Sequence, residues 1–599
     1  MMEALWSGLA AAAAAGLFQG VFQYEKRKLL RQNQKRAEEI SFDRLFALVK
    51  EELYEETKKY LDYKEQSEEY ERAKSRCSHL KLALKQCGYG YRSDKTYVIE
   101  MIKDIILRLL PSRDAVYAIV PYQDAEALSL EDMFDILLYH YEQEHQEKGL
   151  EVLIEKYRLD RPKNVIENGE TPSYIITAEE IRAIYAAENI ELSHEEECIL
   201  LAHKIYRYYK GFGVVDRLRD MAIDGVSGGV SGKINEEVGN EFKQKLENYF
   251  WQERDDVLKE QTYRNYDSVW IFFRGKPIHL AFLSFQSEKE LRRVCQNIYR
   301  YNKAGQLSEN IGYKVNDMRD GSRVVVVRPP FSESWAFFVR KFHIKKLEID
   351  QLFAGPGAEL LAAWLRYLVK GGRIMAITGS QGSGKTTLLM ALIKHIYGTL
   401  TLRIQEMAFE LHLRKVYPMR NILTFRETEF VSGQAGLDLQ KKTDGAVNIL
   451  GEVATDEVAA LMLQTAQVAS LFTLFTHHAK TTADLVLSLR NSLLKCNIFR
   501  DEVVAEEQVT EVVQFDIHLG KDYAGNRYVE RITEIIPQET GYRLQDVIVY
   551  HNGGYELKNL PTSQNLEAMS RAMTAEDQEE FTLFTEGCRR MIKNGEFTD

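Results

Sequence analysis

An eight-residue, glycine-rich segment is the part of this sequence best suited to chemistry. Gly379 to Thr386 reads G-S-Q-G-S-G-K-T and follows a short apolar stretch, residues 373–378. Residues 385–397 then place apolar side chains at helical spacing, which predicts a strand, a tight loop and a helix in that order. Small residues let backbone N–H groups surround phosphate at the positive end of a helix. The segment therefore predicts a P-loop, which is typical of nucleotide-binding proteins.

The residues of this loop have separate expected roles toward ATP and Mg²⁺. Lys385 can reach the β- and γ-phosphates, and the Thr386 hydroxyl can bind the metal. The residues expected to line the nucleotide are Gly379, Ser380, Gln381, Gly382, Ser383, Gly384, Lys385, Thr386 and Thr387. The alternative, a glycine-rich turn with an incidental lysine, fits the flanking strand and helix patterns poorly.

Nucleotide hydrolysis also requires an acidic residue at the end of a neighbouring strand, to orient water or support the metal. The apolar stretch 447–450 ends in Gly451-Glu452 rather than in the more common aspartate. Glu452 is therefore the candidate for water activation. The alternative interpretation is an ordinary surface glutamate.

Strand-like and helix-like segments alternate on both sides of Glu452, which predicts a parallel α/β sheet. The expected strands are 400–405, 446–450 and 471–476, and the expected helices are 456–467 and 482–494. A further strand pair, 512–519 and 528–536, is joined by a turn at 522–526. The fold class is thus α/β, with a C-terminal RecA-like P-loop domain.

The sequence before the P-loop has a different pattern. Residues 41–110 are rich in charged residues and leucine at helical spacing, and helical patterns continue to about residue 209. Strand-like periodicity begins near residue 267, and a charged helix is expected over 234–261. The Gly/Ser cluster 224–232 is expected to be a structural loop, because it lacks the spacing of a phosphate cradle.

These patterns predict five regions in a chain too long for one hydrophobic core. Residues 1–24 form a possible membrane anchor, and 25–205 a mostly helical N-terminal region. Residues 206–345 form an α+β module, 346–560 the P-loop domain, and 561–599 a helical C-terminal tail.

Composition restricts the classes of partner. The formal net charge of −11 gives no general basic surface, which disfavours nucleic acid and makes protein partners the expected ones. The six cysteines show no metal-ligand spacing and are expected to be reduced thiols in a cytoplasmic protein.

The first residues form the exception to an ordinary globular composition. No charged residue occurs between Ala4 and Tyr24, and a cluster of lysines and arginines follows from Lys26. This length can span a bilayer, and the basic cluster would keep the remainder on the cytoplasmic side. The alternative is a helix that lies on the membrane surface or binds a partner, since alanine is barely apolar and Gln19 and Gln23 oppose insertion.

The motifs around the P-loop resemble the secretion ATPase superfamily, which powers type II and type IV secretion and type IV pili. Gly451-Glu452 is similar to the second acidic motif of that family. Thr476-His477-His478-Ala479 is similar to its histidine motif and places His478 at the family position. Gln405-Glu406 resembles the acidic strand-end motif, which makes Glu406 a further catalytic candidate. A histidine here can sense or relay hydrolysis, although a lone histidine is more often structural.

Two segments before the P-loop resemble the CpaF-like motors of Flp, or tight-adherence, pili. These segments are Asp320-Gly321-Ser322-Arg323-Val324 and Val339-Arg340-Lys341-Phe342. The resemblance implies that Arg323 and Arg340 contact nucleotide phosphates, from this module or from a neighbouring subunit. A guanidinium suits that role because it pairs with two phosphate oxygens. Ordinary salt bridges are the alternative.

The resemblance implies a homohexameric ATPase at the cytoplasmic face of the membrane, with membrane platform proteins as partners. The sequence departs from the family at Gln405-Glu406 and after Glu452, where Val453-Ala454-Thr455-Asp456 replaces the usual arginine. Two alternatives therefore remain: a nucleotide-binding scaffold that hydrolyses poorly, and a RecA-like nucleic-acid translocase.

Overall fold

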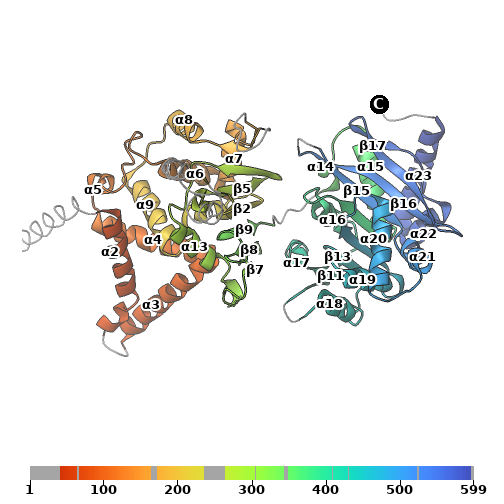
Figure 1. Ribbon diagram of the computed structural model, residues 1–599, viewed down its shortest axis with the longest axis horizontal. Coiled ribbons are helices and arrows are strands. Elements are labelled where there is room, and N and C mark those ends of the chain that lie inside the picture. The colour runs from red at the N-terminus through yellow and green to blue at the C-terminus, as the bar shows by residue number, and fades with distance from the viewer. Residues whose placement is uncertain are drawn as a thin grey trace, which may run out of the picture. The chain divides into compact units, whose positions relative to one another are not determined.

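The computed structural model divides the chain into two compact units, Met1–Lys341 and Phe342–Asp599 (Figure 1). The residues described are 41–63, 67–163, 172–231, 233–234, 263–303, 305–342, 348–407, 409–428, 431–522 and 525–594. The expected anchor at 1–24 and most of the expected helix at 234–261 lie outside these ranges. Within them, no helix is both long enough and apolar enough to cross a membrane.

Unit 1 begins with a bundle of helices, as the charged helical pattern predicts. The helices are α2 (Phe42–Glu56), α3 (Glu68–Gln86), α4 (Arg92–Leu109), α5 (Arg113–Tyr117), α6 (Leu130–His145), α7 (Gly149–Tyr157), α8 (Ala178–Glu188), α9 (His194–Tyr209) and α10 (Asp216–Asp220). Polar N-caps fix several of their starts. Thr177 and Ser193 form capping boxes with Glu180 and Glu196 at the starts of α8 and α9.

A seven-stranded sheet follows the bundle, in the order β1-β6-β5-β2-β9-β8-β7. Its strands are β1 (Ile175–Ile176), β2 (Gly225–Gly228), β5 (Val269–Phe273), β6 (Lys276–Leu280), β7 (Tyr313–Asp317), β8 (Arg323–Val327) and β9 (Ala336–Arg340). All neighbouring strands are antiparallel except β1 and β6. Helix α13 (Glu288–Ile298) buries Leu291, Val294 and Cys295, and a separate ribbon pairs β3 (Lys233–Ile234) with β4 (Tyr263–Arg264).

The expectation of a loop over the Gly/Ser cluster is wrong for Gly225–Gly228. These residues form β2, a fully buried strand between β5 and β9. A Cβ at Gly225 would lie 2.4 Å from the Val339 carbonyl oxygen, and one at Gly228 would lie 2.7 Å from the Phe337 ring. The glycines therefore allow close approach of neighbouring groups, a role that strand propensity does not reveal.

The helical bundle and the sheet of unit 1 share one hydrophobic core. Buried residues from α2 to α9 form a continuous cluster with buried residues of β5, β8, β9 and α13. Figure 1 shows the bundle packed directly against the sheet. The N-terminal helices are thus built into the α+β module.

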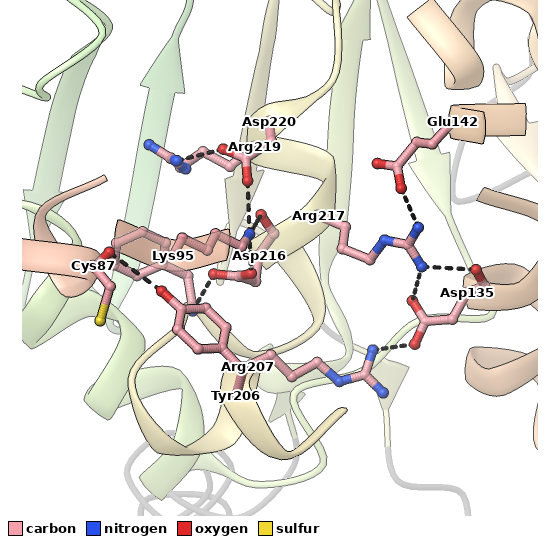
Figure 2. Close-up of polar contacts among 12 residues, drawn as sticks. Cys87, Lys95, Asp135, Glu142, Tyr206, Arg207, Asp216, Arg217, Arg219 and Asp220 are labelled. Atoms are coloured by element: carbon pink, nitrogen blue, oxygen red, sulfur yellow. Dashed lines mark hydrogen bonds and ion pairs between the residues drawn. The ribbon is translucent and has the colours of Figure 1, made fainter. Parts of the chain in front are cut away.

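A network of buried ion pairs centres on α10 (Figure 2). Lys95 of α4 donates to Asp216 and, at 2.7 Å, to Asp220. Arg217 donates to Glu142 and to the Asp135 carbonyl oxygen of α6. Buried charges require partners of this kind, because an isolated charge in a protein interior costs several kcal/mol.

The same network extends to the sheet. The Arg219 guanidinium pairs with Asp220 and lies 3.8 Å from Asp320, in the turn between β7 and β8. Lys341, directly after β9, donates to the Arg219 and Met221 carbonyl oxygens. Burial lowers the pKa of Lys341 to about 8. Segment α10 therefore connects the helices to two strand ends.

Unit 2 is built on a nine-stranded sheet in the order β12-β11-β13-β14-β10-β15-β16-β17-β18. The first six strands in that order are parallel and the last three are antiparallel. The strands are β10 (Met375–Gly379), β11 (Leu402–Glu406), β12 (Ile422–Arg426), β13 (Val447–Leu450), β14 (Phe472–His477), β15 (Phe515–Lys521), β16 (Arg527–Pro537), β17 (Tyr542–His551) and β18 (Gly554–Leu557). The predicted parallel α/β sheet is confirmed.

Helices cover this sheet and complete the second core. They are α14 (Ile349–Leu352), α15 (Ala358–Lys370), α16 (Lys385–Ile393), α17 (Leu413–Val416), α18 (Gly433–Gln440), α19 (Asp456–Val468), α20 (Thr482–Lys495), α21 (Glu502–Val512), α22 (Ser563–Ala572) and α23 (Ala575–Asn594). The C-terminal helices belong to this core through Met569, Phe581 and Cys588. All six cysteines are free thiols.

Candidate functional site

The glycine-rich segment forms the turn between β10 and α16. Strand β10 is fully buried between β14 and β15, so its carboxyl end has a fixed position in the sheet. Gly379 and Gly384 have φ angles of 139° and 99°, which strongly favour glycine. At Gly379 a Cβ would also lie 2.5 Å from the Leu519 carbonyl oxygen. The predicted strand, loop and helix are therefore confirmed as local structure.

Helix α16 presents an uncapped N-terminus to this loop. Its N-cap is Gly384, and no side chain bonds to the first turn from that position. The first N–H groups of a helix have no intrahelical partners, and they carry the positive end of the helix dipole. The arrangement fits a phosphate group, and the half-buried Thr386 in this turn fits as a hydroxyl ligand for an accompanying Mg²⁺.

Lys385 lies across its own loop. Its side-chain nitrogen donates to the carbonyl oxygens of Gly379 at 2.8 Å and Ser380 at 2.9 Å. The residue is only 7% exposed. The same Nζ also lies 3.2 Å from Nδ1 of His478.

His478 connects Lys385 to Glu452. Its Nε2 lies 3.1 Å from Oε1 of Glu452. Because an ammonium group only donates, Nδ1 accepts from Lys385 and Nε2 carries the proton donated to Glu452. Three residues singled out from the sequence therefore form one continuous polar chain, Lys385–His478–Glu452.

This polar chain gathers at the carboxyl ends of three neighbouring parallel strands. Lys385 follows β10, His478 follows β14, and Glu452 lies two residues after β13. The turn at Glu452 is bonded to the histidine strand, since the Thr476 hydroxyl donates to the Gly451 carbonyl and Val453 N–H donates to the Thr476 carbonyl. Binding sites of open α/β sheets form at this edge.

His477, the other histidine of the motif, points into the protein. Its Nδ1 accepts from the Ala479 N–H at 3.1 Å, and the Ser488 hydroxyl lies 3.4 Å from its Nε2. Burial, with the nearby Lys385 charge, lowers the pKa of His477 to about 4. It is therefore neutral at physiological pH and positions the strand end.

Glu406, the further catalytic candidate, lies at the end of β11 and is buried. Its Oε1 accepts from the N–H groups of Glu410 and Leu411, both at 2.9 Å. Its Cγ would lie 3.1 Å from a Cβ at Gly451, so it adjoins the Glu452 turn. These bonds give Glu406 a loop-holding role, and its catalytic role stays a prediction.

Arg323 and Arg340 are direct neighbours in unit 1. They lie directly opposite each other in the antiparallel pair of β8 and β9, so both side chains lie on the same face of the sheet. Their contact with a nucleotide stays a prediction.

Sequence reasoning missed a second polar group behind the P-loop. Asp516 and His518 alternate along β15, and both adjoin Thr378 of β10. The signal was present, because F-D-I-H-L places two polar side chains on one face of an otherwise apolar strand. Arg527, at the start of β16, was missed as well. Its Cδ would lie 3.4 Å from a Cβ at Gly384.

No protein-family model and no curated protein sequence matches this chain. Among solved structures, the VirB11 ATPase of the Brucella suis type IV secretion system matches at 18% identity and a TM-score of 0.27, covering 45% of this chain and 86% of that one. The Legionella pneumophila ATPase DotB matches at 13% identity and a TM-score of 0.34, covering 55% and 81% of the two chains.

The pilus retraction motor PilT with bound ADP matches at 15% identity and a TM-score of 0.33, covering 54% of this chain and 83% of that one. TM-scores this low support no argument about fold or function.

Proposed function

We propose that unit 2 binds ATP at the Gly379–Thr386 loop and hydrolyses it with Mg²⁺ as cofactor. The observation that carries the proposal is the polar chain Lys385–His478–Glu452, with distances of 3.2 and 3.1 Å, at the carboxyl edge of the parallel sheet. A structural lysine would not require a glycine-rich loop and an uncapped helix beside it. These features together suit a γ-phosphate and an attacking water.

The proposed mechanism assigns a separate task to each side chain. On nucleotide binding, Lys385 exchanges the carbonyl oxygens of Gly379 and Ser380 for phosphate oxygens, which are stronger acceptors for an ammonium group. Glu452 orients the attacking water and takes its proton. His478 contacts both groups, so movement of Lys385 toward phosphate changes the hydrogen bonding of Glu452.

A more specific role follows from the motif resemblance. We propose a homohexameric motor for pilus assembly or protein secretion, on the cytoplasmic side of a membrane and coupled to platform proteins. Arg323 and Arg340 would contact nucleotide phosphates from the same or a neighbouring subunit. Their adjacent positions on β8 and β9 suit a paired contact.

The test of hydrolysis is a steady-state ATPase assay on the full chain and on Lys385→Ala and Glu452→Gln. We expect each variant to lose about 100-fold or more in kcat, while Glu452→Gln retains ATP binding. Equal, near-zero rates in all three proteins would contradict hydrolysis. Retained binding with such rates would favour a nucleotide-binding scaffold, which the departures at Gln405-Glu406 and after Glu452 support. A several-fold stimulation by DNA would favour a translocase.

A further inference from the structure

A buried carboxylate joins two segments of the proposed site from behind. Asp516 of β15 has no exposed surface, and its two oxygens accept from two different threonines. Thr378 Oγ1 donates to Oδ1 at 2.6 Å, and Thr482 Oγ1 donates to Oδ2 at 2.7 Å. Both threonines are buried as well.

Each threonine adjoins a segment of the site. Thr378 directly precedes Gly379, the first residue of the P-loop. Thr482 is the first residue of α20 and lies four residues after His478. Asp516 is therefore a direct side-chain link between the start of the P-loop and the end of the loop that carries His478.

The loop from 478 to 481 is fixed at both ends. At its start, His477 is paired in register with Thr378 across β14 and β10. At its end, Thr482 is held by Asp516. The Lys385–His478 contact closes a ring that returns to the P-loop. The hydrogen bond from Thr482 thus ties the end of the His478 loop to Asp516, which lies 38 positions after His478.

Polar and charged groups surround the Asp516 carboxylate. His518 Nδ1 lies 2.8 Å from the same Thr378 hydroxyl, so it can donate to Thr378 while Thr378 donates to Asp516. Arg531, paired with His518 in register, attracts the charge, whereas Glu530 opposes it. An ionised Asp516 accepts from both threonines at once, which an apolar residue of similar size could not do.

We propose that Asp516 is a positioning residue, which holds the His478 loop against the P-loop so that His478 contacts Lys385 and Glu452. This inference rests on the proposed ATP hydrolysis and adds a residue outside the recognised motifs. Asp516 touches no reacting atom in this role. It acts through Thr378 and Thr482.

The test removes one hydrogen bond and keeps the shape of the side chain. Thr482→Val deletes the hydroxyl that donates to Asp516, and Thr482→Ser restores it. Thr465→Val is the matched control, because Thr465 is equally buried and its hydroxyl donates within α19 to the Leu461 carbonyl at 2.6 Å. Each full-length variant is compared for kcat, for affinity toward a fluorescent ATP analogue, and for hydrogen–deuterium exchange of peptides covering 478–484.

We expect Thr482→Val to lower kcat by about tenfold, with analogue affinity changed less than about threefold, because ground-state phosphate contacts remain. Exchange within 478–484 should accelerate, and Thr482→Ser should restore both properties. Thr465→Val should change neither. If Thr482→Val behaves like Thr465→Val in rate and in exchange, the inference is wrong. If wild type itself fails to hydrolyse ATP, the proposed function fails, and the exchange result still decides whether Asp516 positions the loop.

Discussion

The two units use buried polar groups in different ways. In unit 1, the buried Lys95 pairs with the buried Asp216 and with the largely buried Asp220, on the short segment α10. In unit 2, the chain Lys385–His478–Glu452 begins at a buried lysine and ends at side chains that are 47% and 40% exposed. Buried ion pairs of this kind hold a fixed arrangement of side chains. A polar chain that opens to solvent keeps a donor and an acceptor within reach of a ligand, so the second arrangement is the one suited to chemistry.

The comparison predicts that breaking the α10 network damages folding and leaves nucleotide binding intact. Lys95→Met removes the cation that pairs with the buried Asp216 and with Asp220, and we expect a loss of about 3 to 5 kcal/mol in the stability of unit 1. Differential scanning calorimetry measures the loss. Lys59→Met is the matched control, since the exposed Lys59–Glu56 pair should contribute less than about 1 kcal/mol.

ATP-analogue affinity of Lys95→Met, measured below its first unfolding transition, should stay within about twofold of wild type. A large affinity loss there would show that the network also shapes the nucleotide site.

The next largest expected effect concerns Asp516, where a substitution should raise the stability of the fold instead of lowering it. Burial raises the pKa of Asp516 from 3.8 to about 6. An acid with a raised pKa stabilises the fold fully below its unfolded value, and this stability is lost as pH rises from about 4 to 6. The carboxylate therefore costs about 3 kcal/mol at neutral pH relative to its protonated form.

Asp516→Asn removes this titration and should unfold at a higher temperature than wild type at pH 7.5. Melting curves of both proteins at pH 4, 5, 6 and 7.5 measure the difference, which should shrink toward zero at the lowest pH. A constant difference across this range would contradict the assignment. Stability gained together with catalytic rate lost would fit a residue retained for function.

Arg527 gives the smallest expected effect. Its side chain adjoins Gly384 at the start of α16, where a guanidinium can reach a phosphate bound at the loop. We expect Arg527→Ala to weaken ATP-analogue binding about 3- to 10-fold, corresponding to about 1 kcal/mol. Arg543→Ala on β17 is the control for loss of an exposed arginine. Equal affinities of the two variants would exclude a nucleotide contact by Arg527.

The sequence was most informative where pattern and motif agreed. The strands and helices around the P-loop lie within a few residues of their expected positions. Their sequences are periodic apolar segments separated by glycine-containing loops, which indicates where each element begins and ends. Lys385, Glu452 and His478 were each found from motifs, and the sheet brings them together because parallel strands end at one edge.

Two features were not predicted from the sequence, because contacts between distant parts of the chain determine them. Gly225–Gly228 lacks strand propensity, and only the approach of Val339 and Phe337 explains its glycines. The sequence analysis assigned no role to Asp516, whose two threonine donors lie 138 and 34 positions away. Spacing along a chain does not record such long-range partners.

The single core of unit 1 has a mechanical consequence. Because the helices α4, α6 and α9 and the strands β8 and β9 contribute to one packed interior, and α10 is bonded to both, we expect these elements to move as one body. A displacement of the helices is therefore expected to move the strand ends that carry Arg323 and Arg340 as well. The packing of α4, α6 and α9 thus also restrains the positions of these two arginines.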